Sequence, residues 1–433
     1  MKIAIIGSGY VGLVSGACFA ELGNKVACVD IDESKIKKLN KNIMPIYEPG
    51  LDEIIFRNRK NKNLAFTSDL KKAIKESEII FICVGTPPKD NGEADLSYVE
   101  NVARAIADVM DSYKVIVEKS TVPVETGDKI SKSIRECNIH KVDFDVVSNP
   151  EFLREGSAVN DFMHPDRIVV GCQSERAKKI MQSLYKPLKS PIIFTDIKSA
   201  EIIKHASNSF LAAKISFINS IASICELAGA DVGEVAEGMG LDKRIGRGFL
   251  DAGIGYGGFC FPKDAEAFIR ISEKMGYDFR LLKEVQEINN SQRRNFVKKI
   301  EKALWVVKGK NIGVLGLSFK PNTDDMRFAP SIDIITELQK DGAKIKAYDP
   351  KSMEKSKEIL KGILYCNGPY DAAKDADALV IITEWDEFKN LDLKKLKKIM
   401  RRPLIIDGRN IFALQDAKRE GFSYISIGRK EII

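Results

Sequence analysis

Lys2-Ile3-Ala4-Ile5-Ile6-Gly7-Ser8-Gly9-Tyr10-Val11-Gly12 is the stretch that decides the fold. Its apolar start predicts a strand, and its glycines have the spacing G-x-G-x-x-G. Residues 13–22 continue with helical periodicity as far as Gly23. A strand, a glycine turn and a helix in this order are the fingerprint of a dinucleotide-binding unit. We therefore expect Gly7, Gly9 and Gly12 to contact a dinucleotide.

A second apolar run, residues 25–29, ends in Asp30 about twenty residues after the glycine turn. An acid at this spacing bonds the adenosine ribose hydroxyls, and its charge repels the 2′-phosphate of NADP. The sequence therefore predicts NAD as the cofactor. Two further apolar runs end shortly before Thr86 and Thr121, and ligands gather at such carboxyl ends of strands. Both threonines are candidates for the cofactor site, although a threonine close to proline is also a common turn residue.

The stretch 253–264, with the sequence GIGYGGFCFPKD, places Cys260 after a glycine-rich loop and before an expected helix. Pro262 suits the first helical position because its φ is already near the helical value. The positive end of the helix dipole and nearby Lys263 would both favour thiolate over thiol. An inert buried cysteine is the alternative, but a glycine run fills a core poorly. We expect Cys260 to be a nucleophile.

The composition bounds the class of protein: the chain has 433 residues, of which 44% are hydrophobic and 30% charged. This is typical of a soluble protein of two or three domains. Residues 3–20 are uncharged but contain four glycines and no cleavage-site pattern, so we expect neither a membrane span nor a signal peptide. Eight cysteines without a C-x-x-C pair and three scattered histidines indicate no metal site and no disulfide framework, which favours the cytoplasm. The net charge of +7 comes from dispersed lysines, so we expect no nucleic-acid partner.

The sequence after Trp305 repeats the N-terminal pattern. Residues 311–320 form an apolar run with a glycine turn, residues 341–349 lead into Asp349, and residues 376–383 form another apolar run. These features predict a second α/β domain of similar winding. Its glycine turn lacks the full fingerprint, so we expect no second dinucleotide there.

Residues 199–228, between the two halves, contain no glycine or proline and carry an apolar stripe of helical period. They predict a long helix on which Lys204 and Asn208, four residues apart, share a face. We expect this helix to join two copies of the chain in a homodimer. Burial of the stripe within one chain is the alternative.

The chain resembles the UDP-glucose/GDP-mannose dehydrogenase family along essentially its whole length. Besides the fingerprint with Asp30, the motifs that carry the resemblance lie at 84–87, 118–123, 149–156, 204–208, 255–264 and 316–320. The sequence Gly-Tyr-Gly-Gly before the cysteine is similar to the branch that acts on UDP-glucose, whereas the N-acetylhexosamine branch usually has histidine directly before the cysteine. Phe259 stands where a serine is commoner.

The resemblance implies an α/β fold with two Rossmann-like doubly wound domains joined by a long central helix. It implies an NAD-binding domain at 1–198, a central helical region with the dimer contact and catalytic cysteine at 199–300, and a UDP-sugar-binding domain at 301–433. It further implies two successive NAD-dependent oxidations of the C6 alcohol of UDP-glucose to the carboxylate.

The resemblance also assigns roles in that reaction. Cys260 would capture the aldehyde as a thiohemiacetal, which becomes a thioester that water cleaves. Lys204 would stabilise the C6 oxyanion, and Asn208 would add a hydrogen-bond donor. Three residues resemble the groups that position or activate water, and which one is the base at each step stays open: Thr121, Glu151 and Asp264.

Binding residues follow from the same resemblance. The expected NAD contacts are Gly7, Gly9, Val11, Gly12, Asp30, Lys35, Thr86, Thr121, Glu155, Lys263 and Arg327. The expected UDP-glucose contacts are Glu151, Phe152, Leu153, Arg154, Glu155, Lys204, Asn208, Arg244, Phe249, Leu250, Asp251, Ala252, Gly253, Gly257 and Lys320. Apart from the resemblance, Lys35 and Arg244 are ordinary surface charges.

Other functions remain open from the sequence. The nearest is a dehydrogenase of GDP-mannose or of a UDP-N-acetylhexosamine. A different class is a non-catalytic sensor of NAD or a nucleotide sugar on the same fold, because fold alone does not fix function. The joint presence of Lys204, Cys260 and Asp264 argues against a sensor.

Overall fold

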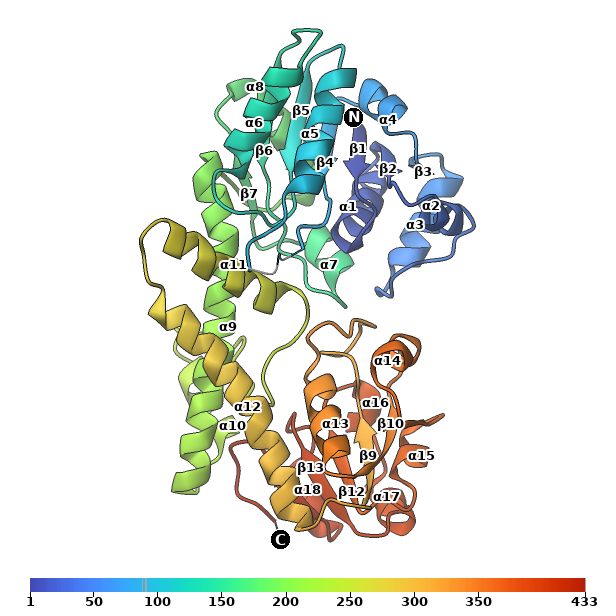
Figure 1. The fold of residues 1–433 in the computed structure, drawn as a ribbon, viewed down its shortest axis with the longest axis vertical. Helices are drawn as coiled ribbons and strands as arrows, with labels where there is room; N and C mark the ends of the chain where they lie inside the picture. The colour runs from blue at the N-terminus through green and yellow to red at the C-terminus, as the bar shows by residue number, and fades with distance from the viewer. Residues whose placement is uncertain (88, 90–91, 433) are drawn as a thin grey trace. The chain divides into compact units, whose positions relative to one another are not determined.

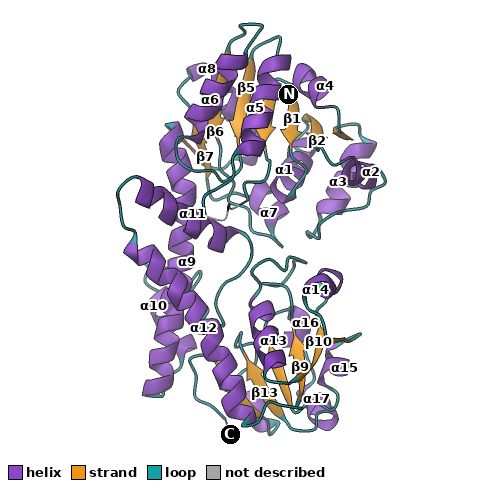
Figure 2. Cartoon of the chain, viewed as in Figure 1, coloured by secondary structure: helices purple, strands orange, loops and turns teal. Residues whose placement is uncertain are grey.

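The computed structural model describes residues 1–87, 89 and 92–432 (Figure 1). The chain forms two compact units, each with its own sheet (Figure 2). The first unit is Met1–Ser207 with Glu266–Tyr277, and the second is Asn208–Ala265 with Asp278–Ile433.

The first unit is built on an eight-stranded sheet. Its strands lie in the order β3 (Leu64–Thr67), β2 (Lys25–Val29), β1 (Lys2–Ile6), β4 (Ile79–Ile82), β5 (Lys114–Glu118), β6 (Phe144–Ser148), β7 (Ile168–Gly171) and β8 (Ile192–Thr195). Neighbouring strands are parallel except β6 and β7, which are antiparallel. The first six strands have the order 3-2-1-4-5-6 of dinucleotide-binding folds, so ligands are expected at the β1/β4 switch point.

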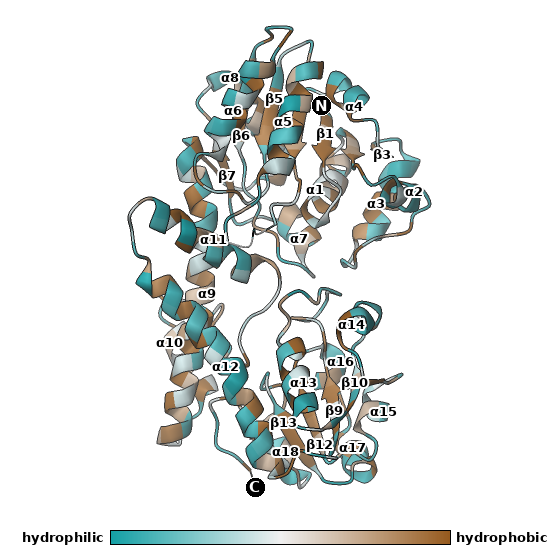
Figure 3. Ribbon diagram, viewed as in Figure 1, coloured by the Kyte–Doolittle hydropathy of each residue, from teal (hydrophilic) through white to brown (hydrophobic). Residues whose placement is uncertain are grey.

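Helices cover both faces of this sheet, which is why its central strands are apolar on both sides (Figure 3). The helices are α1 (Tyr10–Glu21), α2 (Glu33–Asn40), α3 (Leu51–Lys60), α4 (Leu70–Glu76), α5 (Ser97–Val109), α6 (Thr126–Cys137), α7 (Ala158–Met163) and α8 (Glu175–Tyr185), with the 3₁₀ turn Lys186–Leu188. One core layer contains Ile3, Ile5 and Leu13, and the other contains Ala4, Ile80 and Ile106.

The second unit has a six-stranded sheet whose strands are all parallel. Their order is β11 (Leu364–Tyr365), β10 (Lys344–Tyr348), β9 (Asn311–Leu315), β12 (Ala378–Ile381), β13 (Leu404–Asp407) and β14 (Ser423–Ser426). This order repeats the winding of the first sheet, and the expectation of a second Rossmann-like domain is confirmed.

The remaining helices complete the fold. They are α9 (Ile197–Ala228), α10 (Val232–Gly240), α11 (Cys260–Lys274), α12 (Arg280–Leu304), α13 (Pro330–Lys340), α14 (Met353–Ile359), α15 (Pro369–Ala373), α16 (Asp386–Lys389), α17 (Leu393–Ile399) and α18 (Leu414–Arg419). Ile218, Ala222 and Cys225 of α9 pack in the core of the second unit with Phe296 and Ile300 of α12.

The long central helix is confirmed as α9, which has 32 residues and contains the division between the units. In the part of the chain that the structure describes, α9 is the one helix whose length and composition would allow it to cross a membrane. The core helices of soluble proteins pass the same test.

Candidate active site

The glycine turn between β1 and α1 has the geometry of a dinucleotide site. Gly7 has a φ of +101°, and a Cβ there would lie 2.6 Å from the Cys83 carbonyl oxygen. A Cβ at Gly12 would collide with the Gly7 carbonyl oxygen, whereas a Cβ at Gly9 would have no neighbour within 4 Å. The first and third glycines thus allow the turn and the close helix packing, and the second leaves open space at the start of α1. These are the three glycine roles of a pyrophosphate-binding turn.

Asp30 follows β2 and lies directly beside this turn. Its Oδ2 accepts hydrogen bonds from the Ser8 N–H at 2.9 Å and from the Lys35 ammonium at 2.8 Å, and its Oδ1 accepts one from the Asp32 N–H at 3.0 Å. Asp30 is buried, while the Lys35 side chain is partly exposed. The carboxylate is therefore held at the end of β2, where a ribose would meet it.

Thr86 and Thr121 follow β4 and β5 and lie together, as strand ends in a parallel sheet require. The Thr86 hydroxyl donates a hydrogen bond of 2.9 Å to the Thr121 carbonyl oxygen. The segment that carries Thr121 is also held by α9, because the His205 Nε2 lies 2.8 Å from the Val122 carbonyl oxygen.

A buried ion pair joins α9 to the segment that follows β6. The Lys204 Nζ lies 2.9 Å from the Glu151 Oε1, and the two side chains are only 5% and 6% exposed. The other Glu151 oxygen accepts a 2.6 Å hydrogen bond from the Leu153 N–H. The Lys204 ammonium also lies 5.4 Å from the centre of the Phe152 ring, on which the Arg167 guanidinium stacks at 3.6 Å. A buried lysine of this kind can stabilise a developing oxyanion.

Within the second unit, Cys260 is the first residue of α11 and is half-buried. The expectation that Pro262 opens the helix is wrong by two residues, because proline is tolerated throughout a first helical turn, where N–H groups have no helical partner. Asp264, one turn further on, is buried and accepts a 2.7 Å hydrogen bond from the Asn208 Nδ2. Its other oxygen lies 2.8 Å from the Lys263 ammonium.

Three buried cysteines, all in the first unit, differ from Cys260 in setting. Burial raises the pKa of the Cys18 and Cys83 thiols to about 12, and it raises the pKa of Cys28 as well. Such thiols stay protonated and inert at neutral pH. Cys260 is at a helix start, where the backbone N–H groups favour negative charge.

The glycines before Cys260 serve close packing inside the second unit. Gly255 has a φ of +92°, and a Cβ there would lie 2.6 Å from the Asn289 Oδ1. A Cβ at Gly257 would collide with the Phe328 carbonyl oxygen. The protein's own backbone therefore fills the side of Gly257 on which a side chain would lie, and contact between Gly257 and the sugar stays a prediction.

Phe259, the departure from the commoner serine, lies near two of the residues predicted to bind the cofactor. The Lys263 ammonium is 5.5 Å and the Arg327 guanidinium 4.2 Å from the centre of its ring. Arg327 also donates hydrogen bonds of 2.6 to 3.0 Å to the Asp325 carboxylate.

Several residues predicted to bind substrate have protein partners or lie in the core. Arg244 is 88% exposed and pairs with Asp242 at 2.6 Å. Arg154 pairs with Asp161 at 2.6 Å. Asp251 pairs with Arg247 at 2.6 Å and is exposed.

The loop around Asp251 is anchored in the second unit. Leu250 and Ala252 are buried in its core. Phe249 has a φ of +66°. The Gly253 N–H donates to the Asn219 Oδ1 at 2.9 Å.

Three more of the predicted binding residues are Val11, Glu155 and Lys320. Val11 is half-buried on α1, and Glu155 follows Arg154 in the 151–158 segment. The Lys320 ammonium lies 5.4 Å from the centre of the Phe319 ring.

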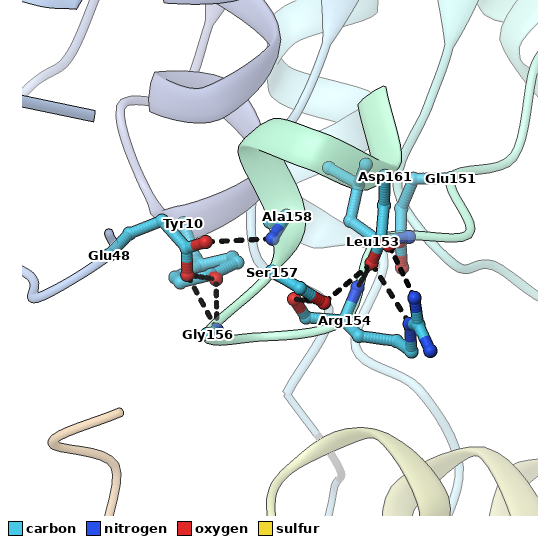
Figure 4. A network of polar contacts seen from close by, with 9 residues as sticks. All are labelled: Tyr10, Glu48, Glu151, Leu153, Arg154, Gly156, Ser157, Ala158 and Asp161. Atoms are coloured by element: carbon cyan, nitrogen blue, oxygen red, sulfur yellow. Dashed lines mark hydrogen bonds and ion pairs between the residues drawn. The ribbon is translucent and has the colours of Figure 1, made fainter. Parts of the chain in front are cut away.

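Sequence reasoning missed a buried carboxylate, Glu48, that lies next to the site. It bonds Tyr10 and the backbone of the segment that carries Glu151 (Figure 4). Its motif, Tyr47-Glu48-Pro49-Gly50, has the turn residues of an ordinary loop, so the burial of Glu48 became evident only in the structure. Among the described residues, no group of three or more histidine, cysteine, aspartate or glutamate side chains could hold a metal ion.

Comparison with known proteins places this arrangement in a family. Residues 1–189 match the NAD binding domain, residues 198–291 the central domain and residues 313–414 the UDP binding domain of the UDP-glucose/GDP-mannose dehydrogenase family.

Three similar proteins span the whole chain. The UDP-glucose 6-dehydrogenase TuaD of Bacillus subtilis (strain 168) is 52% identical over 432 residues, which cover 100% of this chain and 94% of that protein. The UDP-glucose 6-dehydrogenase of Rhizobium meliloti (strain 1021) is 49% identical and is covered completely, as is this chain. The solved UDP-glucose dehydrogenase of the archaeon Pyrobaculum islandicum is 38% identical with a TM-score of 0.92, covering 99% of this chain and 98% of that one. This chain belongs to the UDP-glucose/GDP-mannose dehydrogenase family.

Proposed function

We propose that this protein is a UDP-glucose 6-dehydrogenase, which converts UDP-glucose into UDP-glucuronate by two successive NAD-dependent oxidations at C6. Identities near 50% over the full length to relatives with that name support the substrate. The observation that carries the mechanism is Cys260 at the first turn of α11, one turn before the buried Asp264–Asn208 hydrogen bond.

The residues of the first unit fit NAD. The open space at Gly9, at the start of α1, suits a pyrophosphate, and the buried Asp30 carboxylate suits ribose hydroxyls. When bound, NAD accepts the hydride that leaves C6 in each oxidation. Lys35, Thr86 and the other residues of the predicted cofactor set would hold it.

The chain's own side chains carry the remaining chemistry. The Cys260 thiol adds to the C6 carbonyl of the aldehyde, so a C–S bond forms and the carbonyl oxygen becomes the hydroxyl of a thiohemiacetal. Loss of the second hydride from C6, together with the hydroxyl proton, leaves a thioester. Water then cleaves the C–S bond, giving the carboxylate and returning the thiol.

Lys204 and Asn208 stabilise the negative charge that develops on the C6 oxygen, the first as a buried ammonium and the second as an amide donor. The two candidate bases, Glu151 and Asp264, are both buried and each already accepts a hydrogen bond. Thr121 offers a third site for holding water.

Two measurements test this function: the yield of NADH per UDP-glucose, and the activity that remains when the Cys260 thiol is removed. The wild type should release two NADH per UDP-glucose without free aldehyde, and Cys260→Ala should bind both ligands but make carboxylate several orders of magnitude more slowly. Cys137→Ala, at another half-buried cysteine, is the matched control and should keep normal activity. Near-normal formation of UDP-glucuronate by Cys260→Ala would remove the covalent mechanism.

A substrate panel separates this function from its neighbours in the family. UDP-glucose, GDP-mannose and UDP-N-acetylhexosamines are offered with NAD, and NADH is recorded for each sugar. We expect UDP-glucose to give the highest kcat/KM. A higher value for another sugar would reassign the substrate, and no NADH from any sugar would favour the sensor function.

We also propose that the enzyme is a cytoplasmic homodimer joined through α9. Phe210, Phe217 and Ile224 are spaced by seven residues, so they share one face of the helix, and they are 67%, 51% and 58% exposed. A second copy of the same face is the simplest cover for such an apolar stripe. Light scattering should find a dimer for the wild type and for the control Tyr98→Glu, but a monomer for Phe217→Glu. A monomeric wild type with full activity would refute the dimer.

A further inference from the structure

Glu48 lies in the connector 41–50 between α2 and α3, and it is the one buried residue of that connector. Its side chain is 4% exposed. A carboxylate is almost never fully buried without partners, because the loss of its hydration is costly. The position of Glu48 therefore calls for a reason beyond filling space.

Both oxygens of Glu48 accept hydrogen bonds from the segment that follows β6 (Figure 4). Its Oε1 accepts from the Ala158 N–H at 2.7 Å, and its Oε2 accepts from the Gly156 N–H at 2.6 Å. Its Oε2 also accepts the hydroxyl hydrogen of Tyr10. The Tyr10 oxygen in turn accepts a hydrogen bond of 3.2 Å from Gly156 N–H.

Tyr10, the side chain that Glu48 bonds, lies at the dinucleotide turn. It is the first residue of α1 and follows Gly9 directly. Burial raises the pKa of Tyr10 and of Glu48. A phenol is protonated in the neutral range at its ordinary pKa already, so Tyr10 is a hydrogen-bond donor there.

Most of the UDP-glucose contacts that we predict in the first unit lie in the segment 151–158. It begins with Glu151, which is paired to Lys204, and Phe152, which lies against that ammonium. It ends at Gly156 and Ala158, the two amides that Glu48 holds. Glu48 thus ties the far end of this segment to the first residue of α1.

We propose that Glu48 is a positioning residue for the oxidation: it fixes the 151–158 segment against the dinucleotide turn in the conformation that receives the sugar of UDP-glucose. This inference rests on the proposed function. Glu48 acts through the backbone amides of Gly156 and Ala158 and through Tyr10.

The number of hydrogen-bond donors around Glu48 requires a carboxylate at this position. Three donors converge on two oxygens, and an ionised carboxylate is acceptor-only with about four lone-pair sites. A glutamine has one acceptor oxygen, and its NH₂ group would face an N–H or O–H donor. Glu48→Gln therefore loses at least one of the amide contacts while almost conserving side-chain volume.

The experiment compares the wild type with Glu48→Gln, Tyr10→Phe and a control. The control is Glu21→Gln, because Glu21 also accepts hydrogen bonds from distant side chains of the first unit, Arg57 and Asn58, which belong to α3 and not to 151–158. Hydrogen exchange is followed in peptides that cover 151–158. The Kd of UDP-glucose is measured by titration, and the KM values for UDP-glucose and NAD are measured separately.

We expect Glu48→Gln to speed exchange in 151–158 and to weaken UDP-glucose about tenfold in Kd and KM, with the KM for NAD changed less than twofold. Tyr10→Phe should change the same quantities in the same direction but less, and Glu21→Gln should leave them unchanged. Unchanged exchange in 151–158, or an equal loss for both ligands with faster exchange throughout the unit, would overturn the proposal.

Two further results keep the test decisive. If Glu48→Gln does not fold, Tyr10→Phe carries it, because that change removes one hydroxyl only. If the wild type gives no NADH from UDP-glucose, the proposed function fails, while the exchange of 151–158 still decides whether Glu48 positions the segment.

Discussion

Removing the ammonium of Lys204 tests whether this buried lysine has a structural role, a catalytic role or both. The Lys204–Glu151 pair is 5% and 6% exposed, with 2.9 Å between Nζ and Oε1. Lys204→Met keeps most of the apolar stem but leaves the Glu151 carboxylate buried, with the Leu153 N–H still bonded to its other oxygen.

The size of the effect follows from the burial. Loss of one partner of a buried ion pair costs about 3–5 kcal/mol, because the other charge stays buried and uncompensated. Replacement of both partners by neutral groups of similar volume costs much less. We therefore expect Lys204→Met to destabilise the protein by about 3–5 kcal/mol, and the double variant Lys204→Met/Glu151→Gln to recover most of that loss.

The assay combines urea unfolding with turnover. A double-mutant cycle compares the wild type, Lys204→Met, Glu151→Gln and the double variant. Lys214→Met is the control on the same helix. Among the described residues, the Lys214 ammonium bonds the carbonyl oxygens of Ile245 and Gly246 and pairs with no buried charge, so its loss should be small. We expect kcat to fall about 10²–10³-fold in Lys204→Met, the usual loss for one oxyanion donor, and to stay low in the double variant.

Two results would refute this reasoning. Additive changes in stability, with a coupling below about 0.5 kcal/mol, would mean that the pair is not a unit. Recovery of kcat in the double variant would mean that Lys204→Met lost activity only because the buried charge disturbed the fold.

Three more outcomes follow from the structure. Asp30→Ala should raise the kcat/KM for NADP relative to that for NAD more than tenfold, because it removes the repelling charge and frees the Lys35 ammonium for a 2′-phosphate. Adding Lys35→Ala should cancel most of the gain. An unchanged ratio in steady-state kinetics would contradict the assignment of Asp30. Gly12→Ala should weaken NAD in a binding titration and lower the Tm, since the new Cβ meets the Gly7 carbonyl oxygen; normal NAD affinity would show that the turn can adapt. Burial raises the pKa of Glu201 from 4.5 to about 7, so the folded state holds the proton of this carboxyl more tightly than the unfolded state does. The contribution of Glu201 to stability therefore falls as pH rises from about 4.5 to 7. Over that window the Tm of Glu201→Gln should rise relative to the Tm of the wild type, whereas parallel Tm curves would count against the raised pKa.

Local sequence patterns were sufficient for the fold class. The strand, glycine turn and helix at residues 2–21 depend on neighbours in the chain, and β1 and α1 lie where the pattern predicts them. The same holds for α9, whose period and lack of glycine or proline specify a helix by itself. The second sheet could be predicted because its apolar runs repeat the N-terminal order.

Parts of the candidate site could not be predicted, because they depend on contacts between distant residues. Nothing in the neighbourhood of Gly257 indicates that the Phe328 carbonyl oxygen fills the space of its missing Cβ. Likewise, the partners that hold Arg154 and Arg327, Asp161 and Asp325, become evident only once the chain is folded.

The sequence by itself predicted the winding of both sheets and an NAD-binding domain, and it singled out Asp30 and Cys260 as candidate site residues, since each of these inferences depends on residue type and short spacing. Only the tertiary structure decided which charges are buried together. Lys204 and Glu151 are 53 residues apart, and Glu48 and Ala158 are 110 apart, so no local pattern relates them. The physical reason is that the energy of a buried charge depends on the partners and the water that surround it, and these are set when distant segments pack.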